Sequence, residues 1–252
     1  MTAPLAPPAL RALRCLDLTD LNDDCSEGDV SKLAGRAVTR VGAVAALCVW
    51  PRFAEAARAA APADVRVACV AAFPTGDGRD EDAVADAEGA LAGGADEIDV
   101  VIPWRELLEG RPQSVRARVE RVRRAAGTAT LKAILETGAL PDARTMRRAA
   151  ELAVEGGADF LKTSTGRAPV GATLAAAQVL LEVIAAADRP VGFKASGGIR
   201  TADEAAAYLA LADEAMGEGW ARPATFRIGA SSLLDALVAA LEGRAATAGE
   251  GY

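Results

Sequence analysis

The sequence predicts an α/β fold, a single (β/α)₈ TIM barrel over residues 13–243, on three observations. The chain has 252 residues, the usual length of one such barrel. Short apolar runs alternate eight times with Ala-rich helical patterns. No low-complexity segment inside this range indicates a second domain, so residues 1–12 are expected as an N-terminal segment and 244–252 as a flexible tail. An open, doubly wound sheet is the alternative arrangement of the same elements.

The eight expected strands are apolar on both faces, as is typical of parallel strands covered by helices. They comprise residues 14–18, 44–49, 65–72, 97–102, 130–135, 159–162, 191–194 and 225–228. Each is followed by a helix candidate, at residues 28–40, 52–60, 79–93, 113–126, 141–156, 172–187, 201–214 and 231–243. Ser26 and Thr201 are of the residue types that cap helix N-termini. The Gly-Ala-Asp sequences at 94–96 and 157–159 indicate helix ends that lead directly into strands.

The composition argues against several classes of partner. The net charge of −7 provides no basic surface for nucleic acid. The longest apolar stretch, residues 41–50, is too short to cross a bilayer, and residues 1–12 lack the pattern of a signal peptide. We therefore expect a cytoplasmic protein with no membrane association. None of the cysteines forms a C-x-x-C pair, which favours free thiols over disulfides or a metal site: Cys15, Cys25, Cys48 and Cys69.

Two residue counts restrict the chemistry further. The chain has no histidine, which excludes Ser-His-Asp and Cys-His catalysis as well as His-ligated zinc. Of 28 basic residues only four are lysines, and three of these, Lys132, Lys162 and Lys194, lie in apolar runs where a charge is costly. Lysine can lose its proton whereas arginine cannot. These three positions therefore indicate a requirement for an amine rather than for a positive charge alone.

The expected strands carry further charged residues near their carboxyl ends. In a TIM barrel the active site lies at that end. Two aspartates, three lysines and an asparagine in the first loop form the candidate set: Asp17, Asn22, Asp99, Lys132, Lys162 and Lys194. A buried ion-pair network without catalytic function is the alternative interpretation of these side chains.

This set suits imine formation with a carbonyl compound. A lysine nucleophile must be neutral, and at an unperturbed pKa roughly one lysine in 2,500 is neutral at pH 7. Burial and a neighbouring cation both lower the pKa. Because Lys162 and Lys194 lie on consecutive strands, one can be the nucleophile and the other the perturbing charge. Asp99 could then move protons through water or Lys194.

Three loops predict a phosphate site. They follow the sixth, seventh and eighth strands at residues 163–167, 195–200 and 229–232. Glycines let backbone N–H groups approach an anion, and a helix N-terminus adds a favourable dipole. With Asn22 of the first loop, the expected substrate-binding residues are Thr165, Gly166, Arg167, Gly197, Gly198, Ile199, Arg200, Gly229, Ser231 and Ser232. Cys48, at the end of the second strand, could face this site, although a buried structural thiol is the simpler interpretation.

With these motifs the chain resembles the deoxyribose-phosphate aldolase family, over residues 10–241. The most specific matching stretches are residues 159–166, 191–201 and 227–232, with further matches at 16–22, 48–53, 95–101 and 131–138. Two departures are mild. Ala195 and Ser196 stand where the family pattern has Pro-Ala, and Arg167 stands where it has lysine.

The resemblance implies a class I aldolase in which Lys162 forms the Schiff base. Lys194 and Asp99 would act in proton transfer, with Asp17 and Lys132 in support. The implied reaction is reversible cleavage of 2-deoxy-D-ribose 5-phosphate into D-glyceraldehyde 3-phosphate and acetaldehyde, in deoxyribonucleoside catabolism, with the bond between carbons 3 and 4 as the one broken. No metal or organic cofactor is implied, and a homodimer is left open.

The last residue also carries an expectation. Members of the resembled family end in a tyrosine, which implies that Tyr252 enters the active site and helps to protonate the enamine. A solvated chain end is the alternative. Two other functions also remain open at this stage: another Schiff-base aldolase or transaldolase for a different phosphosugar, and a sugar-phosphate-binding barrel without catalytic activity.

Overall fold

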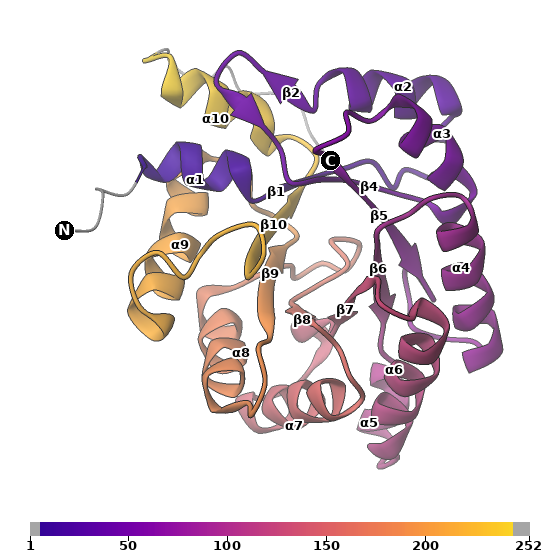
Figure 1. Ribbon diagram of the computed structural model, residues 1–252. Coiled ribbons are helices and arrows are strands. Elements are labelled where there is room, and N and C mark those ends of the chain that lie inside the picture. Colours follow the sequence, from indigo (N-terminus) through magenta and orange to yellow (C-terminus); the bar gives the residue numbers. More distant parts are fainter. Residues whose placement is uncertain (1–5, 244–252) are drawn as a thin grey trace.

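The computed structural model describes residues 6–243, so the predictions for the tail and for Tyr252 lie outside the described residues. Eight parallel strands close into a barrel in the order β1-β10-β9-β8-β7-β6-β5-β4. Helices surround it on the outside (Figure 1). The closed order confirms the single TIM barrel and excludes the open sheet, in which the first and last strands of the order would not pair.

The barrel strands lie within two residues of the expected bounds at either end. They are β1 (Leu16–Thr19), β4 (Ala46–Val49), β5 (Arg66–Ala71), β6 (Glu97–Val101), β7 (Thr130–Ile134), β8 (Phe160–Lys162), β9 (Gly192–Ser196) and β10 (Phe226–Ala230). Nearly every residue in them is buried, because one face meets the helices and the other fills the barrel.

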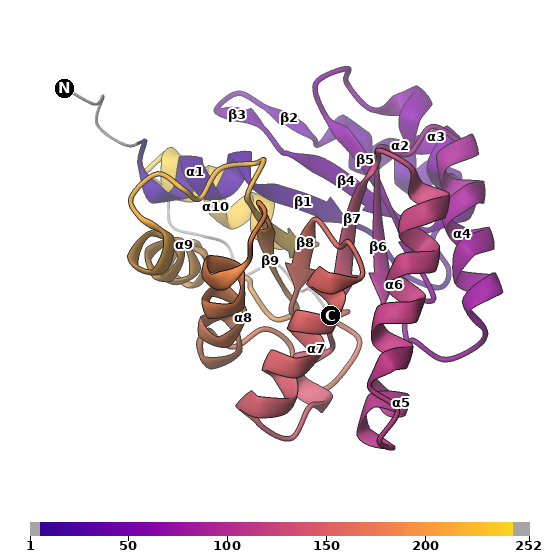
Figure 2. The same cartoon turned by 60° about the horizontal axis from the view of Figure 1, so that its bottom comes forward.

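The helices that follow the strands form a ring in which consecutive helices pack together (Figure 2). They are α2 (Glu27–Gly35), η1 (Pro51–Phe53) with α3 (Ala54–Ala60), α4 (Asp80–Ala92), α6 (Gln113–Ala126), α7 (Ala143–Glu155), α8 (Leu174–Ala186), α9 (Ala202–Met216) and α10 (Leu233–Leu241). Alanines allow close approach to the sheet: in α4 the buried residues are Ala83, Ala87 and Ala90, on one helical face. The predicted caps Ser26 and Thr201 both form capping boxes.

Other elements were not expected from the sequence. The helix predicted over residues 28–40 ends at Gly35, and the rest of that range enters the antiparallel pair β2 (Val38–Thr39) and β3 (Gly42–Ala43). β-Branched residues favour the extended pairing, and the Thr39 hydroxyl donates to the Gly42 carbonyl at 2.8 Å. Three short helical elements also occur: α1 (Pro8–Arg14), which packs on α9 and α10, α5 (Trp104–Leu108) and η2 (Thr137–Ala139).

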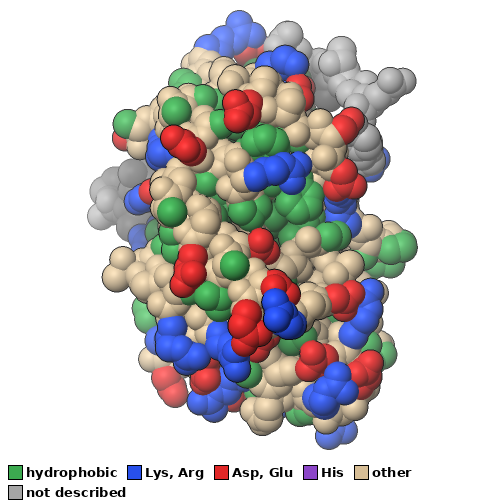
Figure 3. Space-filling model, turned by 90° about the vertical axis from the view of Figure 1, so that its right-hand side faces the viewer, with side chains coloured by type: hydrophobic (Ala, Val, Ile, Leu, Met, Phe, Trp, Pro, Cys, Tyr) green, Lys and Arg blue, Asp and Glu red, His purple; other side chains and the backbone are tan. Residues whose placement is uncertain are grey.

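The outer surface carries charges of both signs. Figure 3 shows acidic and basic side chains interspersed on the face at the right-hand side of Figure 1. None of the helices within residues 6–243 is long and apolar enough to cross a membrane.

One buried arginine fastens the loop after β5 to the outer helices. Arg118 of α6 is 1% exposed, and its guanidinium donates to the carbonyls of Gly76 and Gly78 at 2.7 Å each. It also donates to Asp80 at 2.7 Å, at the start of α4. Gly76 has a φ of +70°, and a Cβ there would lie 2.1 Å from the Ile102 carbonyl oxygen. The loop therefore has little freedom to move.

Replacing Arg118 with methionine should destabilise the fold by about 2–4 kcal/mol, because a buried carbonyl, a partly buried carbonyl and a carboxylate lose their donor. The measurement is chemical denaturation followed by circular dichroism. Arg121→Met on the same helix is the matched control. Arg121 pairs with Glu81 and, more distantly, with Asp80 at 3.5 Å, but its side chain is half exposed, so that change should cost less than about 1 kcal/mol. Equal, small losses in both variants would contradict the role given to Arg118.

Candidate active site

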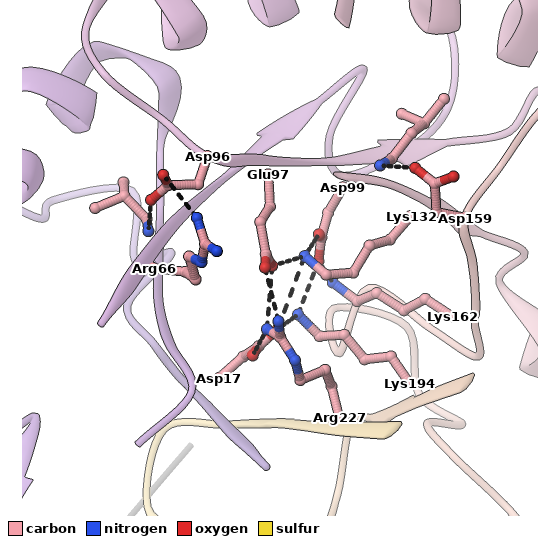
Figure 4. Close-up of polar contacts among 12 residues, drawn as sticks. Asp17, Arg66, Asp96, Glu97, Asp99, Lys132, Asp159, Lys162, Lys194 and Arg227 are labelled. Atoms are coloured by element: carbon pink, nitrogen blue, oxygen red, sulfur yellow. Dashed lines mark hydrogen bonds and ion pairs between the residues drawn. The ribbon is translucent and has the colours of Figure 1, made fainter. Parts of the chain in front are cut away.

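Seven charged side chains from six strands meet inside the barrel (Figure 4). Each of them is at most 6% exposed. They are Asp17, Glu97, Asp99, Lys132, Lys162, Lys194 and Arg227. Charges this far from water are costly unless they compensate one another, so their mutual geometry determines which of them stay ionised.

The strand register brings these side chains together. Glu97 and Asp99 lie two residues apart on β6 and therefore point to the same face of the sheet. Asp99 pairs in register with Lys132 on β7. Lys162 on β8 pairs in register with Lys194 on β9. The predicted proximity of the two lysines is thus confirmed.

Asp99 lies at the centre of the network and contacts all three buried lysines. Its Oδ1 accepts from Lys132 Nζ at 2.6 Å. Its Oδ2 accepts from Lys162 Nζ at 2.9 Å and from Lys194 Nζ at 2.8 Å. Burial opposes ionisation of this carboxyl, but the three ammonium groups together hold its pKa well below the usual range. Asp99 is therefore a carboxylate that all three lysines share.

Arg227 and Glu97 contact the network from the amino-terminal ends of their strands. The Arg227 guanidinium donates to Asp17 Oδ1 and to Glu97 Oε1, both at 2.7 Å. Glu97 also meets Lys132 at 2.6 Å. Neither Arg227 nor Glu97 was among the predicted site residues. Two signals were available: Glu97 stands two residues before Asp99, and Arg227 is a charge within an apolar strand.

Lys194 is held by two carboxylates. Its Nζ lies 2.5 Å from Asp17 Oδ2 and 2.8 Å from Asp99 Oδ2. Gly229 makes room for this side chain, since a Cβ there would lie 2.9 Å from Lys194 Cε. Burial by itself lowers the pKa of Lys194, but Asp17 and Asp99 outweigh it and raise that pKa far above the ordinary value. Lys194 therefore keeps its proton and its charge.

Lys162 is the cation with the weakest compensation in the network. Burial lowers its pKa, the charge of Lys194 lowers it further, and Asp99 opposes both. By contrast, the pKa values of Lys132, Lys194 and Arg227 are raised by their carboxylate neighbours. Within residues 6–243 this network sets four cations against three carboxylates. Loss of one proton balances the charge, and Lys162 is the group that loses it at least cost.

Lys162 also borders a cavity of about 430 Å³ at the carboxyl ends of the strands. The loops around this cavity contribute all eleven substrate-binding residues expected from the sequence: Asn22, Thr165, Gly166, Arg167, Gly197, Gly198, Ile199, Arg200, Gly229, Ser231 and Ser232. The structure thus combines an amine of lowered pKa with a glycine-rich pocket large enough for a small phosphosugar. An amine of this kind can attack a carbonyl compound and form an imine.

Glycines let the loops after β8 and β9 touch through their backbones. Gly197 and Gly198 have φ values of +93° and +87°, which residues with a Cβ rarely adopt. A Cβ on Gly197 would lie 3.0 Å from Gly171 Cα and 3.1 Å from Gly166 Cα. The Ala172 amide donates to the Gly197 carbonyl at 3.0 Å. At Gly166, Gly197 and Gly198 the pocket is therefore lined by backbone, which an anion can approach closely.

Arg167 spans from the loop after β8 to the loop after β1. Its guanidinium donates to the Leu21 carbonyl at 3.1 Å and to Asp23 Oδ1 at 2.5 Å. Asn22 lies between these two partners in the sequence, and its backbone N–H donates to Asp20 Oδ1 at 3.1 Å. Arg167 is thus at the rim of the pocket, where its first contacts are with protein groups.

Cys48 is completely buried inside the barrel and packs against Leu21, Ala68 and Val70. Burial raises the pKa of its thiol, so it is a poor nucleophile. All four cysteines are unpaired and buried, which confirms the prediction of free thiols.

Comparison with known proteins is consistent with this geometry. A curated deoxyribose-phosphate aldolase of Agrobacterium fabrum (strain C58 / ATCC 33970) is 46% identical over 248 residues, covering 97% of this chain and 96% of the relative. A solved structure from Toxoplasma gondii ME49, described as a deoxyribose-phosphate aldolase, has a TM-score of 0.86 at 28% identity, covering 94% of this chain and 97% of that one. The tetrameric deoxyribose phosphate aldolase of Aeropyrum pernix has a TM-score of 0.72 at 29% identity, covering 94% and 93%.

A sequence model described as DeoC/LacD family aldolase matches residues 11–239, which is nearly the whole of the described barrel. The matched range includes every member of the charged network and every residue around the cavity. The chain therefore belongs to the DeoC/LacD family of aldolases.

Proposed function

We propose that this protein is a deoxyribose-phosphate aldolase that reversibly cleaves 2-deoxy-D-ribose 5-phosphate into D-glyceraldehyde 3-phosphate and acetaldehyde. One observation carries the proposal. Lys162, an amine whose pKa is lowered by burial and by Lys194, opens from the charged network into a cavity lined by glycine-rich loops. The curated Agrobacterium fabrum relative, named a deoxyribose-phosphate aldolase, supports the choice of substrate.

The first half of the reaction builds the imine. Neutral Lys162 attacks carbon 1 of the open-chain aldehyde, and the resulting carbinolamine loses water to give an iminium ion. Lys194 is protonated, so it can give a proton to the departing oxygen. Asp99 contacts both amines and can pass protons between them. Asp17, Lys132, Glu97 and Arg227 hold these groups in place.

The second half breaks the carbon–carbon bond. The iminium ion accepts the electron pair of the bond between carbons 2 and 3, while the hydroxyl on carbon 3 gives its proton to the Asp99 carboxylate and becomes the aldehyde of glyceraldehyde 3-phosphate. Cleavage between carbons 3 and 4, as stated in the sequence analysis, is wrong because acetaldehyde contains only carbons 1 and 2. The remaining enamine is protonated at carbon 2, and hydrolysis of the imine releases acetaldehyde and Lys162.

We place the phosphate of the substrate against the loops after β9 and β10. Gly198 and Ser232 border the cavity there, and α10 begins directly after Ser232. Arg167 stands at the rim and supplies a further positive charge. The cytoplasmic location remains a prediction, which four unpaired thiols suit, and a homodimer remains open; the Aeropyrum pernix relative is tetrameric.

Borohydride reduction of the protein with acetaldehyde should add one ethyl group to Lys162, because reduction converts the imine into a stable secondary amine. Peptide mass spectrometry locates the label, and a sample without acetaldehyde is the control. A label on Lys132 or Lys194 would reverse the assigned roles. An adduct only with larger ketones would support another Schiff-base aldolase, and no adduct would support a binding protein without catalysis.

Lys194→Arg should lower kcat by about 10²–10⁴, the size expected for loss of a general acid. Arginine keeps the charge but does not give up its proton. Steady-state cleavage of deoxyribose 5-phosphate is the measurement. Lys32→Arg, at an exposed lysine, is the matched control and should be neutral. Near-normal turnover of Lys194→Arg would rule out proton transfer by Lys194.

Ser232→Asp should raise KM for deoxyribose 5-phosphate far more than KM for unphosphorylated deoxyribose. The new carboxylate would stand at the start of α10 and repel a phosphate bound there, whereas the neutral sugar would not feel this repulsion. The two KM values are compared on the same preparation. Equal effects on both sugars would place the phosphate elsewhere.

A further inference from the structure

Glu136 is a buried carboxylate close to the cavity that the mechanism above does not use. It follows β7, is 3% exposed and has a left-handed backbone, with φ of 52° and ψ of 54°. Such a conformation is unfavourable for a residue with a side chain, and it persists only where surrounding contacts enforce it. The carboxyl group has therefore been placed here at a cost in both burial and backbone strain.

Both oxygens of Glu136 face donors of one residue, Thr165. Thr165 Oγ1 donates to Glu136 Oε2 at 2.5 Å, and the Thr165 amide points to Oε1 at 3.4 Å. Burial raises the pKa of Glu136, while these two bonds and the charge of Lys162 oppose that shift. Two donors aimed at two oxygens suit the ionised form, which only accepts hydrogen bonds.

This contact fixes the hydrogen-bonding polarity of Thr165. A threonine hydroxyl has one hydrogen and two lone pairs. The hydrogen is used by Glu136, and one lone pair accepts the Arg167 amide at 3.1 Å. Thr165 borders the same cavity as Lys162, three residues further along the chain. To any further partner, its hydroxyl can therefore only accept a hydrogen bond.

The surrounding backbone prevents this arrangement from relaxing. The Thr137 amide donates to the Thr163 carbonyl at 2.9 Å. A Cβ on Gly138 would lie 2.2 Å from the Val170 carbonyl oxygen, so the two loops are in direct contact. Glu136 is thus held against the loop that carries Thr165 by contacts on both sides.

We propose that Glu136 is a positioning residue that orients the Thr165 hydroxyl as an acceptor, and that this pair selects aldehydes with a hydroxyl next to the carbonyl group. The inference rests on the proposed function. Between the imine and the phosphate, carbon 2 of the sugar has no polar group, and the oxygen on carbon 3 has no hydrogen once it is an aldehyde. The hydroxyl on carbon 4 keeps its hydrogen throughout. It is therefore the substrate group that an acceptor-only Thr165 matches in both directions of the reaction.

The experiment measures kcat/KM for condensation of acetaldehyde with glyceraldehyde 3-phosphate and with 3-oxopropyl phosphate, which lacks that hydroxyl. The ratio of the two values is independent of the amount of active protein. Glu136→Gln keeps the volume but offers one acceptor oxygen to two donors, so it should lower the ratio by about 3–10-fold. Glu136→Ala, which frees the Thr165 hydroxyl to rotate, should lower it as well.

A double-mutant cycle tests whether Glu136 acts through Thr165. In Thr165→Val the preference should already be lost, and adding Glu136→Gln should not change the ratio further. Thr137→Val is the matched control: its buried hydroxyl is on the same loop and has no hydrogen-bond partner within residues 6–243, so the ratio should stay normal.

Three results would overturn the inference. If Glu136→Gln and Glu136→Ala both keep the normal ratio, Glu136 contributes to the structure of the loop and not to substrate selection. A further drop of the ratio on adding Glu136→Gln to Thr165→Val would show that Glu136 does not act through Thr165. Failure of the unmodified protein to join acetaldehyde to glyceraldehyde 3-phosphate would instead refute the proposed function, and this inference with it.

Discussion

The contact of Asp99 with three buried ammonium groups is the interaction on which the rest of the site depends. Without this carboxylate, Lys132, Lys162 and Lys194 would repel one another in a space that excludes water. Breaking a buried ion pair commonly costs about 3–5 kcal/mol, whereas hydrophobic replacements of equal volume are often neutral or stabilising. A network of this kind is therefore a poor device for stability. Its physical consequence is to set the protonation of each amine.

The network sets different protonation states for Lys162 and Lys194, which lie on neighbouring strands. Lys194 is bound by Asp17 and Asp99, whereas within residues 6–243 Lys162 pairs with Asp99 alone and shares it. Burial acts on both in the same direction, so the difference in pKa comes from the number of carboxylates. The barrel creates this asymmetry through register: β8 ends at Lys162, beside the cavity, while Gly229 lets Lys194 reach down to Asp17.

Much of this could be predicted from the sequence because the signals are local. Apolar runs identify the strands, and lysines within such runs stand out in a chain that otherwise uses arginine. What the sequence could not provide depends on spatial neighbours. The fork of Arg227 onto Asp17 and Glu97 exists only once the barrel has closed, since these residues are far apart in the chain. The pairing of Arg167 with Asp23 likewise depends on how two loops meet.

The residues assigned to the reaction stand on strands, whereas those assigned to substrate selection stand on loops. The reacting amine and its charge partners stand on strands, whose positions are fixed by backbone pairing on both sides. The groups that meet the rest of the substrate stand on loops, which in isolation would be mobile. Here those loops are fastened to one another, at Gly171 and Gly197 on one side and at Glu136 and Thr165 on the other. Because one loop takes part in both contacts, a change at Glu136 is transmitted to the pocket without any contact between Glu136 and the reacting atoms.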